Sequence, residues 1–552
     1  MKLHTKIVSS LEKIFATDKV DALPKEKKIR ALRGERVSFQ FAYKNELDEG
    51  DTCYRMILTP KIEGALAPFT TIRRVMQVPV VKPVCTSGDD NYLSKEPGLF
   101  PDLLIPLTYG GRLRCDYNVL GTLWIDIDIP SDYSGALTDS LTVSLSDDSG
   151  NVLSSETIET EVIDALLPEG DTYYTRWFHC DCLAMYYNVP VWSKRHWEII
   201  ENFIKGAVKI GINTLLTPLI TPSLDGPRMI TQLVKIKKNG EKYSFDFRRL
   251  GKWIDICDRA GIKYFEISHL FTQGGAVRTP RISANVDGEE KLIFTYETDS
   301  RDGEYRIFLR ALLTAFLRYM KKRGVDKRCI FHISDEPHID NIEYYRAAKE
   351  CIADIVKGYK LIDALSDIEY YNEGLVECPV PITRHAEDFY AAGIDPLWTY
   401  YCTGPGDSNH SNSFIAMPSY RTRSLGMQLY KFNIEGFLHW GYNFYNNNSS
   451  DSLIDPYNEL SGDNWVPAGD PFIVYPAANG TPLSSLRAEV TYHAFEDIRA
   501  MKLCESLYSR ETVVAEMEKA YGKKITFTSS AYSTKEFMSV RERINDMIKA
   551  KI

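Results

Sequence analysis

The hydrophobic and polar positions of the chain follow two different periods, and the change falls near residue 166. Up to residue 165, apolar and polar residues alternate in short runs that clusters of Gly, Asp and Ser separate. The clearest runs are 36–43, 54–58, 122–129 and 141–145. A period of two is typical of strands with one face on a core, so residues 1–165 are predicted to form an N-terminal β-sandwich.

Beyond a linker at 166–170, short apolar runs alternate with amphipathic helical segments. This alternation is typical of βα units around a parallel sheet. The predicted strands are 173–182, 212–222, 263–270, the run that ends near 335, 360–365, 381–384, 397–401 and 436–440. Eight strands predict a (β/α)8 TIM barrel, which we assign to residues 170–508 as the catalytic domain.

Helical periodicity and capping signals define the helices of this region. Ser193 is expected to cap one helix, and segments 248–260 and 304–322 show apolar positions on one face. Asp340 with Glu343 fits a capping box for the helix after the fourth strand.

The end of the chain is predicted to be mostly helical. A helix at 482–508 is expected to close the barrel, and residues 509–552 to form a tail with helices at 511–521 and 535–549. Before them, the polar and aromatic residues 442–465 are expected to form a loop over the barrel mouth.

Composition limits the possible partners and the compartment. The 552 residues carry a net charge of −9, which leaves no basic surplus for binding nucleic acid. No apolar segment is long enough to span a membrane, and the N-terminal residues lack the apolar core of a signal peptide. The 11 cysteines are odd in number and form no CxxC pair, which is typical of a reduced, cytoplasmic protein without a metal site. The oligomeric state stays open.

The candidate chemistry centres on the segment RCIFHISDEPHID at 328–340. An apolar run leads to two adjacent carboxylates, Asp335 and Glu336, and then to Pro337, which cannot continue a strand. The carboxylates are therefore expected at the carboxyl end of a parallel strand, where barrels place their active sites. A pair of solvated loop carboxylates is the alternative interpretation.

The ends of the other predicted strands bring polar and aromatic side chains to the same face. The candidate substrate-binding residues are Trp177, His179, Asp181, His269, Tyr400, Tyr401, Trp440, Asn443 and Tyr445. Aromatic faces and hydrogen-bonding groups around two carboxylates are typical of a sugar site. The tryptophans can equally be barrel packing and the histidines structural, and Asp181 can be the partner of a neighbouring His or Arg.

Adjacent carboxylates suit one form of glycoside cleavage. Most retaining glycosidases use two carboxylates on opposite sides of the glycosidic bond. Consecutive residues fit better with substrate-assisted cleavage, in which the 2-acetamido oxygen of the sugar attacks the anomeric carbon. The alternatives are a glycosidase for another sugar on the same scaffold and a noncatalytic carbohydrate-binding protein. A metal-dependent hydrolase is disfavoured because no compact set of ligands appears.

Residues 333–338 (ISDEPH) resemble the catalytic segment of glycoside hydrolase family 123 and its relatives with the domain of unknown function 4091. Further segments that match in the same order are 177–184 (WFHCDCLA), 211–213 (GIN), 215–219 (LLTPL), 469–476 (GDPFIVYP) and 485–487 (SLR). The resemblance covers residues 170–505, and the N-terminal part, with GER at 34–36, is similar to the family's N-terminal domain.

This resemblance implies a β-N-acetylgalactosaminidase-type exo-hydrolase that retains the anomeric configuration through an oxazolinium intermediate. Matched by motif, Asp335 orients the acetamido group, and Glu336 acts as general acid and then as base. The implied partner is a glycan or glycoconjugate substrate. No cofactor, nucleic acid or membrane is expected to take part.

Overall fold

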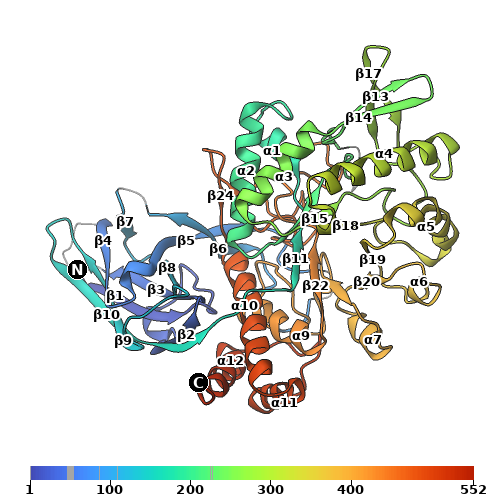
Figure 1. Ribbon diagram of the computed structural model, residues 1–552. Helices are drawn as coiled ribbons and strands as arrows, with labels where there is room; N and C mark the ends of the chain where they lie inside the picture. Colours follow the sequence, from blue (N-terminus) through green and yellow to red (C-terminus); the bar gives the residue numbers. More distant parts are fainter. Residues whose placement is uncertain (1, 47–54, 86–87, 108–109, 224–225, 227) are drawn as a thin grey trace.

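The computed structural model describes residues 2–46, 55–85, 88–107, 110–223, 226 and 228–552. Figure 1 shows the N-terminal strands on one side, the barrel on the other, and the C-terminal helices between them. Tyr54, the first residue of one predicted strand, lies outside the described residues. Within those residues, no helix has the length and apolar character to cross a membrane.

Two five-stranded sheets form the N-terminal part of the described chain, in agreement with the alternating pattern. Their orders are β1-β3-β8-β5-β6 and β2-β10-β9-β4-β7. The bounds are β1 Lys2–Ser9, β2 Lys28–Arg33, β3 Arg36–Glu46, β4 Arg55–Glu63, β5 Thr70–Val80, β6 Gly98–Pro106, β7 Leu113–Asp116, β8 Gly121–Asp128, β9 Thr138–Ser146 and β10 Val152–Leu166. Phe41 and Ile125 of the first sheet share a buried apolar cluster with Val143 and Ile158 of the second, so each sheet covers the apolar face of the other.

Eight parallel strands of the described chain form the barrel, in the order β20-β19-β18-β15-β12-β11-β22-β21. The bounds are β11 Tyr173–Arg176, β12 Thr214–Thr217, β15 Tyr264–Ile267, β18 Cys329–Phe331, β19 Lys360–Ala364, β20 Cys378–Val380, β21 Trp398–Tyr400 and β22 Gly436–His439. The two end strands meet through one parallel bridge between Ile382 and Tyr400, so the barrel is nearly closed. The predicted parallel barrel is confirmed to that extent.

Two strand boundaries differ from the sequence pattern. The strand predicted at 173–182 ends at Arg176, and helix α1 (Cys180–Tyr186) begins soon after it. The side chain of Asn443 binds both the N–H and the C=O of His179, so the backbone at His179 does not continue the pairing of β11 with its neighbours. The strand predicted at 381–384 lies earlier, as β20, and beyond it Ile382 forms a single bridge to Tyr400.

Amphipathic helices cover the barrel strands. They include α2 (Lys194–Lys209), α3 (Arg248–Ala260), α4 (Gly303–Lys322) and α5 (Ile342–Val356). Ser193 caps α2 as predicted, since its hydroxyl accepts a backbone N–H of the first turn. The capping box predicted at Asp340 and Glu343 is wrong, because Asn341 is the N-cap residue of α5 and makes no cap bond. Its amide donates instead to the carbonyl of Gly274 at 2.7 Å.

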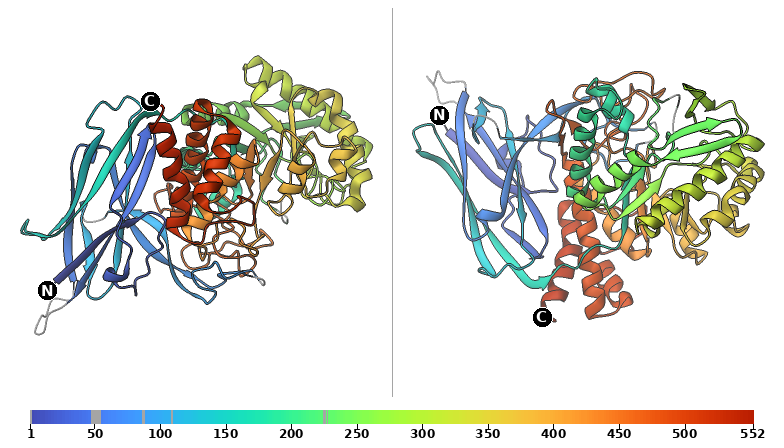
Figure 2. Two further views of the ribbon diagram at one scale, coloured as in Figure 1. Left: turned by 90° about the horizontal axis from the view of Figure 1, so that it is seen from below. Right: turned by 45° about the horizontal axis from the view of Figure 1, so that its top comes forward.

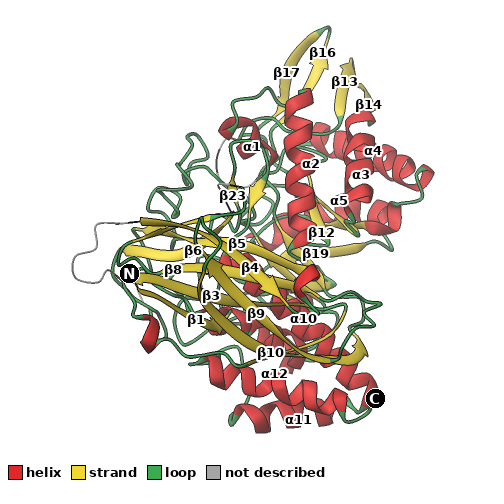
Figure 3. Ribbon diagram, turned by 90° about the vertical axis from the view of Figure 1, so that its left-hand side faces the viewer, coloured by secondary structure: helices red, strands yellow, loops and turns green. Residues whose placement is uncertain are grey.

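A four-stranded sheet that the sequence analysis did not predict projects from the described part of the barrel (Figure 3). Its strands, in the order β14-β13-β16-β17, are β13 Lys235–Asn239, β14 Lys242–Asp246, β16 Ile282–Val286 and β17 Glu289–Phe294. β13 reads KIKKN, in which Ile236 is the buried position. Such a lysine-rich strand lacks the alternation that identifies strands in a sequence.

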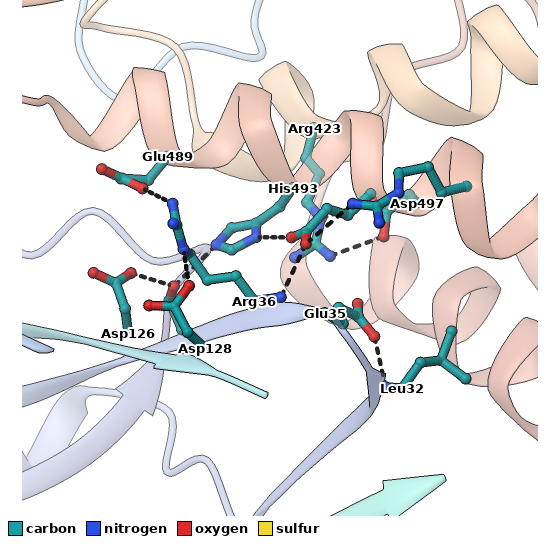
Figure 4. Close-up of polar contacts among 12 residues, drawn as sticks. Leu32, Glu35, Arg36, Asp126, Asp128, Arg423, Glu489, His493 and Asp497 are labelled. Carbon is teal, nitrogen blue, oxygen red and sulfur yellow. Dashed lines mark hydrogen bonds and ion pairs between the residues drawn. The ribbon is translucent and has the colours of Figure 1, made fainter. Parts of the chain in front are cut away.

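The C-terminal helices α10 (Leu486–Leu507), α11 (Arg510–Tyr521) and α12 (Thr534–Lys549) lie between the sheets and the barrel (Figure 2). Charged residues cross this interface. Arg36 of β3 lies 3.6 Å from Glu489 of α10 (Figure 4). Glu35 lies 2.8 Å from Arg541 of α12. Buried charges are tolerated when they are paired in this way. The domain boundaries at residues 165 and 508 stay predictions.

Inside the barrel, His332 bridges two buried carboxylates. Its Nε2 lies 2.8 Å from Oε1 of Glu266 in β15, and its Nδ1 lies 3.3 Å from Oδ1 of Asp363 in β19. Burial alone lowers the pKa of His332, but the hydrogen bonds to Asp363 and Glu266 raise it to about 9. His332 is therefore an imidazolium that joins three neighbouring strands.

The charge of His332 makes the stability of the protein depend on pH. The folded-state pKa lies above the ordinary value of 6.5, so protonation stabilises the fold fully below that pH, and the stabilisation is lost as the pH rises through about 9. Its upper limit is about 3 kcal/mol. We expect the difference in Tm between wild type and His332→Gln to be largest near about pH 6 and to shrink toward about pH 10.

Calorimetric unfolding across this pH range measures the difference. His385→Gln, which removes a half-exposed histidine, is the matched control and should show no such trend. A difference between wild type and His332→Gln that stays constant with pH would show that His332 is neutral in the folded protein.

Candidate active site

A cavity of about 150 Å³ opens at the carboxyl ends of the barrel strands. The residues that line it are Trp177, Gln273, Asp335, Glu336, Ala364, Tyr400, Cys402, Thr403, Leu438, Trp440 and Trp465. This end of the strands is where parallel barrels place their active sites. Of the residues predicted from the sequence, the cavity brings together Asp335, Glu336, Trp177, Tyr400 and Trp440.

Glu336 has an unusual backbone conformation that its neighbours fix. Its φ of +42° lies in the left-handed region, which is strained for a residue with a side chain. The Glu336 N–H donates to the carbonyl of Ala364 at 2.9 Å, and Oε1 accepts the hydroxyl of Tyr400 at 2.7 Å. Burial, and then the Glu336 carboxylate, raise the pKa of Tyr400 well above its usual range, so Tyr400 remains a neutral donor. Gln273 Nε2 lies 3.5 Å from Oε2.

Asp335 lies beside Glu336 in the cavity and is only 4% exposed. Its backbone carbonyl accepts the N–H of Gly274 at 2.7 Å. The residues before it are held from below, because the carboxylate of Asp363 accepts the N–H of Ile333 at 3.1 Å and that of Ser334 at 3.3 Å. The same buried bridge that joins the strands therefore also holds the turn that carries both candidate catalytic residues.

Three tryptophans form aromatic walls around the carboxylates. The indole N–H of Trp177 donates to Oε1 of Glu266 at 2.7 Å, and that of Trp440 donates to Oδ2 of Asp470 at 2.8 Å. The ring of Trp465 lies 5.5 Å from that of Trp440, between centroids. Since buried carboxylates hold two of these rings, the walls have a defined shape before any ligand binds.

His179 and Asp181, both predicted to bind substrate, lie outside the cavity lining. Arg228 donates to both Asp181 oxygens, at 2.5 and 2.7 Å, and to Nδ1 of His179 at 2.9 Å. Burial, and then Arg228, lower the pKa of His179 to about 3, so the ring is neutral and its Nε2 donates to the carbonyl of Trp440 at 2.8 Å. Burial alone raises the pKa of Asp181, but Arg228 lowers it below its usual range. This arrangement matches the alternative interpretation of Asp181 as an ion-pair partner.

Four further predicted residues are fully buried and do not line the cavity. Asn443 binds the backbone of His179, and the hydroxyl of Tyr445 donates to a backbone carbonyl at 2.8 Å. Tyr401 packs between the sheet and the helices, and His269 lies edge-on to Trp177, with ring centroids 5.1 Å apart. Their positions support packing roles, and their assignment as sugar-binding residues stays a prediction.

Several cavity residues were not predicted. Gln273, Cys402 and Thr403 come from loops whose course the sequence pattern does not specify. Trp465 carried a signal, since it ends the polar and aromatic segment expected over the barrel mouth. An aromatic residue in such a loop is a reasonable candidate for a sugar-binding wall.

The cavity offers acid–base and charge-stabilising groups. A carboxyl group beside a phenol can give and take a proton, and a second carboxylate can stabilise developing positive charge. In the part of the chain that the structure describes, no group of three His, Cys, Asp or Glu side chains could hold a metal ion.

Comparisons with known proteins agree with this geometry. The model of the glycoside hydrolase 123 catalytic domain matches residues 177–504. A comparison with curated proteins finds no match. A solved family 123 glycoside hydrolase from Clostridium perfringens, described for its hydrolysis of glycolipid glycans, is 16% identical and has a TM-score of 0.74, with 100% of this chain and 98% of that chain covered.

Two other solved structures are much less similar. The β-glucuronidase of Parabacteroides merdae is 9% identical with a TM-score of 0.32, and covers 90% of this chain and 52% of its own. The endo-β-1,4-mannanase of Thermotoga petrophila is 12% identical with a TM-score of 0.35, and the match covers 60% of this chain and 77% of the mannanase chain. These two likenesses are too weak to carry an argument, whereas the Clostridium enzyme shows the same overall fold. Because the family model matches more than half of its length, this chain belongs to glycoside hydrolase family 123.

Proposed function

We propose that the protein is a retaining exo-glycosidase that removes terminal β-linked N-acetylgalactosamine by substrate-assisted catalysis. One observation carries the proposal: among the described residues that line the cavity, Asp335 and Glu336 are the only carboxylates. A double displacement through the enzyme needs two carboxyl groups on opposite sides of the bond, about 5–5.5 Å apart. Two consecutive residues at one strand end instead favour the acetamido oxygen of the substrate as the nucleophile.

The surroundings of the two carboxylates support different roles for them. Glu336, fixed at one oxygen by Tyr400, protonates the leaving oxygen and then removes a proton from the attacking water. Asp335, almost fully buried, accepts the acetamido N–H and stabilises the positive charge of the oxazolinium intermediate. In this mechanism, neither carboxylate bonds to the sugar.

The shape and surroundings of the cavity support a single terminal sugar as the bound unit. A volume of about 150 Å³ between tryptophan walls favours one ring over an internal stretch of glycan. The Clostridium relative is described as hydrolysing glycolipid glycans, which supports a glycoconjugate substrate. The ten described cysteines are free, which supports action in the reducing cytoplasm.

A panel of nitrophenyl β-glycosides tests the proposed substrate. We expect hydrolysis of the N-acetylgalactosaminide and little release from the galactoside, because the latter lacks the nucleophilic acetamide. Proton NMR of the first product should show the β-anomer. Comparable rates with and without the acetamido group would contradict substrate assistance. Absence of hydrolysis across a panel that includes N-acetylglucosaminide and glucoside would favour a noncatalytic binding protein.

The acid role of Glu336 predicts a specific kinetic defect. Glu336→Gln should fold normally and lower turnover by about 100-fold or more, the usual scale of general acid catalysis. The loss should be larger for a phenyl than for a nitrophenyl leaving group, because the poorer leaving group needs protonation more.

A matched control uses Glu343→Gln, which makes the same chemical change at an exposed position of α5. This variant should keep wild-type turnover. If Glu336→Gln slowed both leaving groups equally, or had near-normal activity on the phenyl glycoside, Glu336 would not be the acid.

A further inference from the structure

The connection between β5 and β6 reaches from the N-terminal sheet to the cavity. We call residues 82–85 and 88–93 of this connection the bracing segment. Its contacts fall on two loops that line the cavity, the loop that carries Trp465 and the loop after β21 that carries Cys402 and Thr403. A segment from the N-terminal part of the chain is therefore in direct contact with the walls of the candidate active site.

The first contact fixes the backbone of Trp465. The ammonium group of Lys82 donates to the carbonyls of Trp465 at 2.8 Å and of Asn464 at 3.1 Å. The carbonyl of Lys82 in turn accepts the N–H of Ala468 at 2.8 Å. Lys82 thus holds the loop on both sides of Trp465, and charge-assisted hydrogen bonds of this kind are stronger than neutral ones.

The second contact fixes the loop after β21. The thiol of Cys85 donates to the carbonyl of Thr403 at 2.8 Å, and the hydroxyl of Tyr92 donates to the carbonyl of Gly406 at 2.7 Å. The N–H of Leu93 donates to the carbonyl of Ala416 at 2.9 Å. These bonds follow the loop along most of its length, so its shape depends on the N-terminal part of the chain.

The bracing segment is itself held in place. Both carboxylate oxygens of Asp89 accept hydrogen bonds from Arg421 at 2.8 Å, and Arg421 is fully buried. The amide of Asn91 donates to Asn409 at 2.7 Å. A buried bidentate pair has a well-defined geometry, so it holds the bracing segment in one position. The segment in turn holds the two loops that it contacts.

We propose that the bracing segment is a positioning element of the active-site cavity, and that Lys82 sets how firmly Trp465 closes the wall over a bound sugar. The kinetic part of this inference rests on the proposed glycosidase function. The structural part does not, because it concerns contacts between residues of this chain. Lys82 therefore influences sugar binding through Trp465 and touches neither reacting carboxylate.

Fluorine NMR of protein labelled with fluorotryptophan tests the structural part. The chain has 8 tryptophans, and Trp465→Phe identifies the signal of Trp465 by its loss. Lys82→Met should shift or sharpen this signal and leave that of Trp253, buried in α3, unchanged. Lys549→Met, which removes a different lysine contact between the tail and the N-terminal sheet, is the control and should leave the Trp465 signal unchanged. An unchanged Trp465 signal in Lys82→Met would overturn the inference.

Kinetics on the nitrophenyl N-acetylgalactosaminide tests the binding part. Lys82→Met should raise KM about five-fold and leave kcat within about two-fold of wild type. The reason is that Trp465 becomes more mobile, whereas Asp335 and Glu336 keep their positions. Lys549→Met should change neither constant. An unchanged KM in an active Lys82→Met enzyme, or a loss in kcat alone, would overturn the inference. If wild type does not cleave this substrate, the proposed function fails while the NMR result still decides the structural claim.

Discussion

Water does not reach the interior of the barrel, so a charged side chain there is stable only when buried groups of opposite charge bind it. Glu266 and Asp363 bind His332 in this way. The two carboxylates do more than neutralise the imidazolium. Glu266 accepts the indole N–H of Trp177, and Asp363 accepts the backbone N–H groups just before Asp335. One buried bridge therefore holds both an aromatic wall of the cavity and the turn that carries its carboxylates.

This arrangement explains how a strained residue can persist at the centre of the site. A left-handed conformation at a residue with a side chain costs on the order of 1–3 kcal/mol. Three hydrogen bonds offset this cost: the Ser334 N–H donates to Asp363, the Glu336 N–H donates to the carbonyl of Ala364, and the Tyr400 hydroxyl donates to the Glu336 carboxylate. The proposed catalytic groups are thus held in fixed positions, as catalysis by fixed electrostatics requires.

The sequence predicted the parts of the fold that depend on local pattern. The barrel strands were recognisable because each is a short apolar run that stops at polar residues. Asp335, Glu336, Trp177, Tyr400 and Trp440 were predicted because they lie at the ends of such runs, and they all line the cavity. The lysine-rich strand β13 was missed because it shows too little alternation, and β14, which alternates, was missed because its five residues are too short a run to stand out.

Several predicted site residues lie outside the cavity lining, and Trp465, which lines the cavity, was not predicted. Tyr401 was assigned with Tyr400, but neighbouring residues of a strand point to opposite faces, and Tyr401 packs against the outer layer. His179 and Asp181 turn away because the first strand ends at Arg176 and a helix follows. The backbone of Trp465 accepts a hydrogen bond from Lys82, almost 400 residues earlier, and no local pattern reports such a contact.

In the proposed mechanism, the substrate's own acetamide, oriented by Asp335, attacks the anomeric carbon. The most direct measurement compares kcat/KM for nitrophenyl glycosides whose acetamido group carries zero, one or three fluorine atoms. Fluorine withdraws electrons from the carbonyl oxygen and makes it a weaker nucleophile. If this oxygen attacks the sugar, kcat/KM should fall by about ten-fold or more from each substrate of the series to the next. We expect this steep decline in wild type. Rates that hardly change along the series would contradict this mechanism, because they would show that another group attacks the sugar.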